Sequence, residues 1–197
     1  NITYDTLDKF TYYDVLGLTK FEEASDKVLC SKLTKAFHMA VKVYHPDKQI
    51  SIAEEDARTI YLKIQNASVT LADQTKRRQY DSLLDFDEKV PTDAQCKAAA
   101  AKGTAAFCAL YAPVFKRNAR FSMTKPVPEM GDENTPYPEV ANFYSFWIKF
   151  DSWRDFSNAC DHDLDNAGSR HEKREWQKEN ARQSKKMKKT EVSRVSD

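Results

Sequence analysis

Two stretches of apolar residues at helical spacing, separated by a proline, constrain the fold of this chain more than any other feature. The first comprises Leu29, Leu33, Ala36, Phe37, Ala40 and Tyr44, and the second comprises Ala57, Ile60, Tyr61, Ile64, Ala67 and Leu71. Apolar side chains that recur every three or four residues mark one face of an amphipathic helix. The first helix must end near Tyr44, because Pro46 disfavours helical geometry at His45. Two such helices joined by a short turn pack antiparallel, so the sequence predicts a helical hairpin.

Short helices are expected on both sides of this hairpin. Before it, Thr11 suits the N-cap of a short helix and Asp14 suits its first turn. Gly17 suits the left-handed backbone conformation that ends such a helix. Behind Asp73, residues 75–81 predict a short and strongly basic helix with little to bury. Two Ser-to-Glu pairs at capping-box spacing predict two further helix starts, at Ser51 with Glu54 and at Ser169 with Glu172.

The second half of the chain is dominated by aromatic residues. Residues 85–105 are polar and Ala-rich, which predicts a linker or a marginal helix. Beyond Phe107 the chain becomes aromatic, and Pro138 suits the start of a helix. The buried face of that helix is expected to carry Val140, Phe143, Trp147 and Phe150.

Composition excludes several classes of protein. Hydrophobic residues make up 41% and charged residues 31% of the chain, which is ordinary for a globular protein. No apolar run reaches spanning length, and the start lacks a basic region followed by an apolar stretch, so we expect the cytoplasm or the nucleus and no membrane contact. The four Cys form no C-x-x-C pair, so we expect no metal site, and we expect no cofactor.

Four short motifs in the first half resemble the J-domain family. They are Tyr13-Asp14-Val15-Leu16-Gly17, Tyr44-His45-Pro46-Asp47-Lys48 with its central His45-Pro46-Asp47, and Lys76-Arg77-Arg78-Gln79-Tyr80-Asp81. Each lies on the element where the family carries it, over roughly residues 10–82. The resemblance implies a four-helix J-domain that stimulates ATP hydrolysis by a DnaK-type chaperone and has no catalytic residue of its own.

The resemblance also implies which residues meet the chaperone. They are His45, Pro46, Asp47, Lys35, Lys42 and Lys48. Proline would stiffen the turn, so that an imidazole and a carboxylate lose little entropy on docking. Taken alone, His45 and Asp47 are also compatible with complementing a helix dipole and forming a turn. An acid–base pair in an enzyme would need a pocket and a nucleophile, and nothing in the sequence indicates either.

One face of the first long helix departs from the family. J-domains usually carry Lys or Arg at positions occupied here by Thr34, His38, Met39 and Val43. Such charges at the rim of an interface mainly set the association rate and its salt dependence. We therefore expect a weaker association with the chaperone, while the trigger of ATP hydrolysis, His45-Pro46-Asp47, stays intact.

The aromatic half resembles the zuotin homology region. The matching segments are Pro113-Val114-Phe115, Ala119-Arg120-Phe121-Ser122, Phe143-Tyr144 with Phe146-Trp147, and Phe150-Asp151-Ser152-Trp153-Arg154-Asp155-Phe156. In zuotin-like proteins this region and the basic segment behind it contact ribosomal RNA on the large subunit. Such proteins usually work with a chaperone-like partner subunit in a ribosome-associated complex.

The basic segment supplies the candidate ribosome-binding and RNA-binding residues. From Ser169 on, ten Lys or Arg stand against five Asp or Glu. The candidates are Arg170, Lys173, Arg174, Lys178, Arg182, Lys185, Lys186, Lys188 and Lys189. Few apolar side chains accompany them, so these cations serve either phosphate neutralisation or solubility. A merely solvated helix, supported by Glu175–Lys178 and Glu179–Arg182 pairs, is the alternative.

The sequence thus predicts an all-α chain: a J-domain hairpin with short flanking helices, a helical zuotin-homology module and an exposed basic helix. The expected domains are 1–84, a linker at 85–106, the aromatic module at 107–168 and the basic helix at 169–197. The function expected from the resemblance is a ribosome-associated co-chaperone for nascent polypeptides. A nuclear nucleic-acid-associated regulator carrying a J-domain and a general cytosolic J-protein are the alternatives.

Overall fold

The computed structural model describes residues 3–20, 26–45 and 53–196, and the regular elements among these residues are helices, with no β-strand. The chain divides into two compact units, Asn1–Asp81 and Ser82–Asp197. The predicted all-α class is confirmed.

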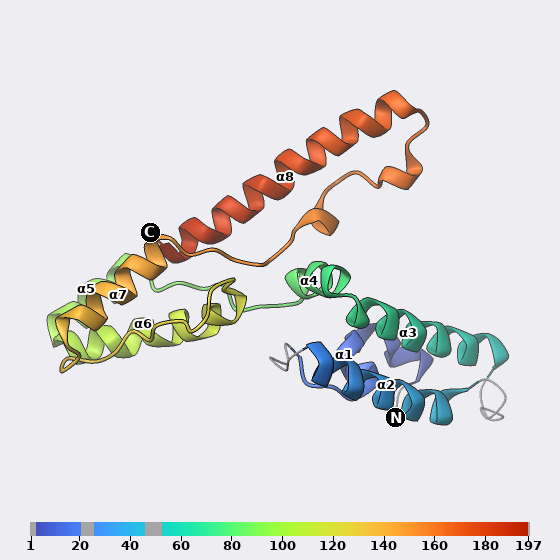
Figure 1. Cartoon of the computed structure of the whole chain (residues 1–197), viewed down its shortest axis with the longest axis horizontal. Helices are drawn as coiled ribbons and strands as arrows, with labels where there is room; N and C mark the ends of the chain where they lie inside the picture. Colours follow the sequence, from blue (N-terminus) through green and yellow to red (C-terminus); the bar gives the residue numbers. More distant parts are fainter. Residues whose placement is uncertain (1–2, 21–25, 46–52, 197) are drawn as a thin grey trace. The chain divides into compact units, whose positions relative to one another are not determined.

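The first unit is the helical hairpin with its flanking helices (Figure 1). Its elements in chain order are the 3-10 helix η1 (Tyr4–Lys9), α1 (Tyr12–Leu16), α2 (Asp26–Tyr44), α3 (Glu54–Ala72) and the greater part of α4 (Gln74–Leu83). α2 packs along α3, and α1 packs against both of them. The core that they share contains Leu7, Tyr13, Val15, Leu16, Leu29, Leu33, Ala40, Ala57, Ile60, Ile64, Ala67 and Leu71. Each large aliphatic side chain buried there contributes about 2 kcal/mol.

The predicted ends of α1 are confirmed. Thr11 accepts a hydrogen bond from the backbone N–H of Asp14, whose carboxylate accepts one from the backbone N–H of Thr11 at 2.8 Å. Gly17 closes the helix in the left-handed region, with φ of 66°. A side chain with a Cβ would be strained at this angle, so glycine suits the stop.

Two sequence predictions for this unit are wrong. The N-cap of α3 is Ala53, without a side-chain hydrogen bond, and Glu54 is the first helical residue instead of the third, so the predicted capping box does not open this helix. Ser51 itself lies outside the described residues. The short basic helix α4 was expected to bury little, yet Asp81 is only 6% exposed and Tyr80 stacks on Tyr12 with ring centroids 4.3 Å apart.

The second unit is built around aromatic side chains. Its helices are α5 (Asp93–Lys102), α6 (Thr104–Asn118) and α7 (Tyr137–Ile148), followed by the short η4 (Ser157–Ala159) and η5 (Leu164–Asn166) and by the long α8 (Arg170–Ser196). A further short helix, η3 (Ala119–Phe121), continues from α6. Residues 85–105, for which the sequence left a linker or a marginal helix open, contain α5 and the start of α6.

Two of the four residues of the stripe expected on α7 are buried within the helix, and a third, Phe150, is buried two residues beyond the end of the helix at Ile148. Phe143, Trp147 and Phe150 are at most 4% exposed. Phe115 of α6 packs on Phe143 and Trp147, each with ring centroids 4.8 Å apart. Pro138 lies in the first turn of α7, as predicted. These contacts join α6 and α7 into one core.

Candidate chaperone-contact and nucleic-acid-contact surfaces

His45 lies directly behind the last residue of α2, at the end of the hairpin where the chain turns toward α3. Its side chain is half-buried, and its imidazole meets the ring of Tyr61 edge to face, with centroids 5.5 Å apart. The hairpin thereby holds the imidazole at its tip. Pro46 and Asp47 complete the predicted trigger. These two residues and Lys48 lie outside the described residues.

The outer face of α2 carries fewer cations than the resemblance implies. Lys35 and Lys42 are exposed, as expected for residues that meet a partner. Between them and beside them lie Met39, 71% exposed, and Val43, 56% exposed. This face therefore combines positive charge with two uncovered apolar side chains.

A buried hydrogen bond fixes α4 beneath α1. The hydroxyl of Tyr13 donates to both carboxylate oxygens of Asp81, at 2.8 and 3.0 Å. Burial raises the pKa of Asp81 to about 6, against the lowering effect of the Tyr13 hydroxyl and of Arg77. Burial likewise raises the pKa of Tyr13. Both residues lie in the motifs that suggested a J-domain, but the motifs did not reveal this contact.

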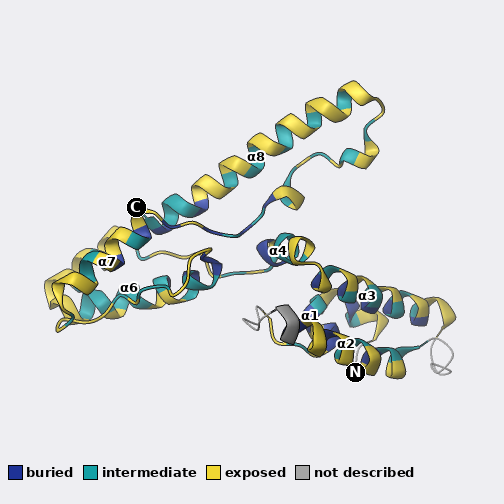
Figure 2. Ribbon diagram, in the orientation of Figure 1, coloured by how far each residue is buried: buried dark blue, intermediate teal, exposed yellow. Residues whose placement is uncertain are grey.

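All nine predicted cations of α8 are exposed (Figure 2). The two pairs expected within the helix are confirmed, with Nζ of Lys178 2.9 Å from Glu175 and Nη1 of Arg182 3.6 Å from Glu179. The hydrogen bond from Lys178 lowers the pKa of Glu175. The helix start predicted at Ser169 is confirmed, because Ser169 accepts a hydrogen bond from the backbone N–H of Glu172 at 3.1 Å. The carboxylate of Glu172 accepts from the backbone N–H of Gly168, at 2.8 Å, instead of from that of Ser169.

α8 is less isolated than the sequence indicated. The segment before it, residues 151–166, runs back along the helix (Figure 1). His162 stacks on Trp176 with centroids 5.1 Å apart, and the amide of Asn180 donates to the backbone carbonyl of His162 at 2.7 Å. Apolar periodicity could not reveal this contact, because polar side chains make most of it.

Near its C-terminal end, α8 is held by buried charges. Nη1 of Arg154 lies 3.4 Å from Glu191, and each of these side chains is 4% exposed. Arg154 also lies 2.8 Å from Glu88 and donates to the backbone carbonyl of Ser82 at 2.8 Å. Burial outweighs the neighbouring arginines and raises the pKa of Glu191. No pattern in the sequence indicated this cluster.

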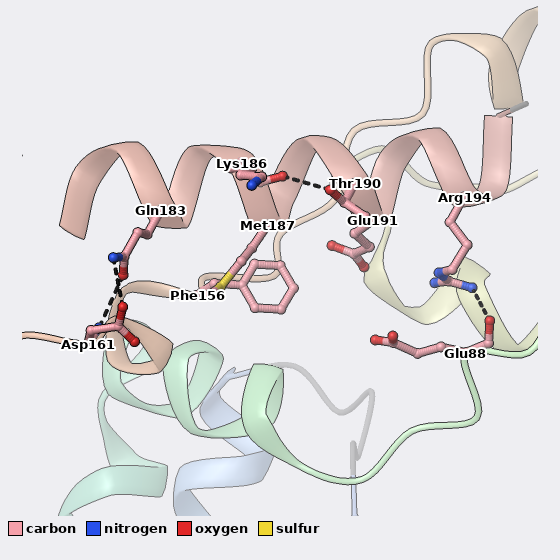
Figure 3. Close-up of a pocket in the computed structure, with 9 residues that line it drawn as sticks. All are labelled: Glu88, Phe156, Asp161, Gln183, Lys186, Met187, Thr190, Glu191 and Arg194. Atoms are coloured by element: carbon pink, nitrogen blue, oxygen red, sulfur yellow. Dashed lines mark hydrogen bonds between the residues drawn. The ribbon is translucent and has the colours of Figure 1, made fainter. Parts of the chain in front are cut away.

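An open cavity of about 520 Å³ lies beside the same end of the helix (Figure 3). Phe156 and Met187 form its apolar wall, and Glu88, Glu191 and Arg194 lie along one side. Within this lining, Arg194 donates a hydrogen bond to the backbone carbonyl of Glu88. Nothing about this cavity indicates catalysis.

The described part of the chain contains no group of three or more His, Cys, Asp or Glu residues placed to hold a metal ion. Among the described helices, none is both long enough and apolar enough to cross a membrane.

Comparison with known proteins identifies both halves. Residues 11–81 match the DnaJ domain, and residues 106–197 match the family described as "Zuotin-like, zuotin homology domain". The chain is 36% identical over 189 residues to DnaJ homolog subfamily C member 2 of Danio rerio, with 93% of the chain and 29% of that protein covered.

Two fungal proteins named zuotin are equally similar. Identity is 35% over 185 residues with that of Schizosaccharomyces pombe, covering 93% of the chain and 39% of the relative. It is 36% over 183 residues with that of Saccharomyces cerevisiae, covering 91% and 40%. The chain thus spans between 29% and 40% of the length of these relatives. With a DnaJ domain followed by a zuotin homology domain in the order of these relatives, the chain belongs to the zuotin-like family of J-domain proteins.

Proposed function

We propose that this chain is the J-domain and ribosome-docking part of a co-chaperone that stimulates ATP hydrolysis by a DnaK-type chaperone and performs no covalent chemistry itself. The observation that carries the proposal is the position of His45, half-buried against Tyr61 at the tip of the hairpin formed by α2 and α3. A side chain held in this way loses little entropy when a partner binds it.

The trigger consists of His45 together with Pro46 and Asp47, and Lys35, Lys42 and Lys48 support the encounter. Asp47 would offer an anion to an arginine of the chaperone. Charge-assisted hydrogen bonds of this kind are about twice as strong as neutral ones. The contact favours the state of the chaperone that hydrolyses ATP.

Docking is assigned to the exposed cations of α8. They would bind the phosphates of ribosomal RNA on the large subunit, in the cytoplasm, and so hold the J-domain near emerging polypeptides. A chaperone-like partner subunit would complete the assembly, as the family resemblance implies. The basic charge of this helix is the support for this part of the proposal, because phosphate neutralisation dominates binding to nucleic acids.

The test is the single-turnover ATPase rate of a DnaK-type chaperone with and without the purified chain. His45→Gln and Asp47→Asn should each reduce the stimulation roughly thirtyfold, as expected when about 2 kcal/mol of a charged contact is lost. Matched controls are His171→Gln and Asp8→Asn, which make the same chemical changes at exposed positions outside the proposed contact residues. Equal stimulation by the tip variants and the controls would refute the proposed trigger.

A further inference from the structure

The nine cations of α8 are not equivalent in the fold. Successive residues of an α-helix are rotated by about 100°, so the side chains divide into faces. The half-buried or buried face of α8 carries Trp176, Asn180, Gln183, Met187 and Glu191. Six of the nine cations lie within an arc of about 120° on the opposite side, which we call the outer face. They are Arg174, Lys178, Arg182, Lys185, Lys186 and Lys189.

Of the other three cations, Lys173 and Lys188 lie beside a segment of opposite charge. We call residues 151–166 the acidic strap, since they carry Asp151, Asp155, Asp161, Asp163 and Asp165. Asp161 of the strap accepts a hydrogen bond from the side chain of Gln183 at 2.9 Å, and its backbone N–H donates to Gln183 at 3.1 Å. The stack of His162 on Trp176 attaches the strap about two turns further toward the start of α8.

Two lysines of the helix are paired with the two ends of the strap. Nζ of Lys173 lies 3.6 Å from Asp165, and Nζ of Lys188 lies 3.9 Å from Asp151. On the outer face, Lys178 and Arg182 are paired with Glu175 and Glu179 of the same helix, whereas neither Lys185 nor Lys189 takes part in an ion pair within residues 53–196. A phosphate that approached Lys173 or Lys188 would have to displace the paired carboxylate. The other carboxylates of the strap would also repel it.

The outer face also lacks the side chains on which protein partners depend. Between Arg174 and Lys189 its positions are occupied by Lys, Arg and Glu, with no aromatic or large aliphatic residue among them. Interfaces between proteins are depleted in Lys and gain most of their affinity from aromatic and Arg anchors in apolar pockets. A row of cations without such anchors fits the phosphates of a nucleic acid.

We propose that the acidic strap restricts RNA binding to the outer face of α8, where Arg174, Lys185, Lys186 and Lys189 contact the phosphates, while Asp151 and Asp165 withhold Lys188 and Lys173 from them. The inference rests on the proposed function, because it concerns the docking surface assigned there. It assigns to the strap a role in selecting which side of the helix meets RNA.

The test is the salt dependence of binding between the purified chain and a short RNA duplex. The logarithm of the affinity falls linearly with the logarithm of the salt concentration, with a slope of about one for each phosphate contact. The double substitution Lys185→Gln with Lys189→Gln should make this slope shallower by about two. The matched double substitution Lys173→Gln with Lys188→Gln removes the same charge from the same helix and should change the slope by less than half as much.

A third variant tests the strap directly. Asp151→Asn with Asp165→Asn releases both flanking lysines, so the slope should become steeper by up to about two. Circular dichroism and tryptophan fluorescence of each variant verify that α8 and its packing are retained. Equal slopes for the two lysine variants, or an unchanged slope after release of the strap, would overturn the inference. Wild-type chain that shows no salt-dependent binding to RNA would instead refute the docking role on which the inference rests.

Discussion

At the scale of single residues, Asp81 is the clearest case of a carboxylate whose ionisation opposes folding. Burial raises its pKa from 3.8 to about 6, even though the Tyr13 hydroxyl and Arg77 lower it. The folded chain therefore binds a proton at Asp81 more tightly than the unfolded chain does. The contribution of Asp81 to stability is consequently greatest below about pH 4 and falls as the pH rises through 6.

Asp81→Asn should remove this pH dependence while keeping an oxygen for the Tyr13 hydroxyl. Between pH 4 and pH 7 the free energy of unfolding of the wild type should fall, relative to the variant, by at most about 3 kcal/mol. Hydrogen exchange of peptides from α3, measured for both proteins at each pH, reports this difference, because α3 packs against α1. Parallel pH curves for the two proteins would contradict the prediction.

Met39 and Val43 give the outer face of α2 an apolar character beside Lys35 and Lys42. Charges at the rim of an interface increase the association rate at low salt and make it depend on salt. Under the proposed function, Met39→Lys with Val43→Lys should raise the association rate with the DnaK-type chaperone several-fold at low salt and steepen its salt dependence. Stopped-flow association kinetics would detect this, with Met39→Gln and Val43→Gln as uncharged controls.

At the scale of elements, the second unit depends on one buried charged group, Arg154. This guanidinium contacts Glu191 of α8 and the Ser82 carbonyl, and it lies 4.9 Å from the centroid of the Phe121 ring. Removing one partner of a buried ion pair costs about 3–5 kcal/mol when the other charge stays buried. The two partners are unequal here, because the raised pKa of Glu191 indicates that burial already disfavours its charge.

Arg154→Ala should therefore destabilise the second unit by about 3 kcal/mol or more, because it leaves the Glu191 carboxylate and the Ser82 carbonyl without this donor. Glu191→Gln should cost only about 1 kcal/mol, since Arg154 keeps Glu88 and the Ser82 carbonyl. Urea denaturation followed by tryptophan fluorescence isolates this unit, because all three Trp residues lie in it. Similar losses in the two variants would count against this asymmetry.

The elements that the sequence predicted are those whose stability comes from apolar periodicity or from a local cap. The stripe on α3 from Ala57 to Leu71 is buried, and the capping residues of α1 act as expected. Contacts between polar groups far apart in the chain could not be predicted in this way. The Tyr13–Asp81 bond, the strap along α8 and the Arg154 cluster all depend on partners that no local pattern relates.

The same distinction applies to the candidate sites. Exposure of the nine cations on α8 followed from the shortage of apolar residues around them. Their division into an outer face and a flank bound by the strap could be recognised only once the structure placed Asp151 and Asp165 beside α8. Both residues lie in the strap that precedes the helix. At the other site, the sequence placed His45 at the end of a helix, but its contact with Tyr61 depends on how α2 and α3 are paired.

At the scale of the whole molecule, the two proposed activities belong to two different units. The trigger lies in Asn1–Asp81, and the docking helix lies in Ser82–Asp197. Joining two binding modules in one chain raises the effective concentration of the second once the first has bound. Under the proposed function, joining the two units in one chain raises the local concentration of the trigger at the ribosome. Neither unit has this effect alone.

This coupling predicts a failure of complementation. One variant keeps docking but lacks the trigger (His45→Gln), and another keeps the trigger but has the charges of Lys185, Lys186, Lys188 and Lys189 reversed. Each alone should fail to stimulate a ribosome-bound chaperone at low concentration, and so should their mixture, because docking and trigger are then on different chains. In free solution at high concentration, the charge-reversed variant, which keeps the trigger, should stimulate the ATPase of the chaperone as well as the wild type does. Restoration of activity by the mixture at low concentration would show that the two activities need not be joined, and that the link between the units has another purpose.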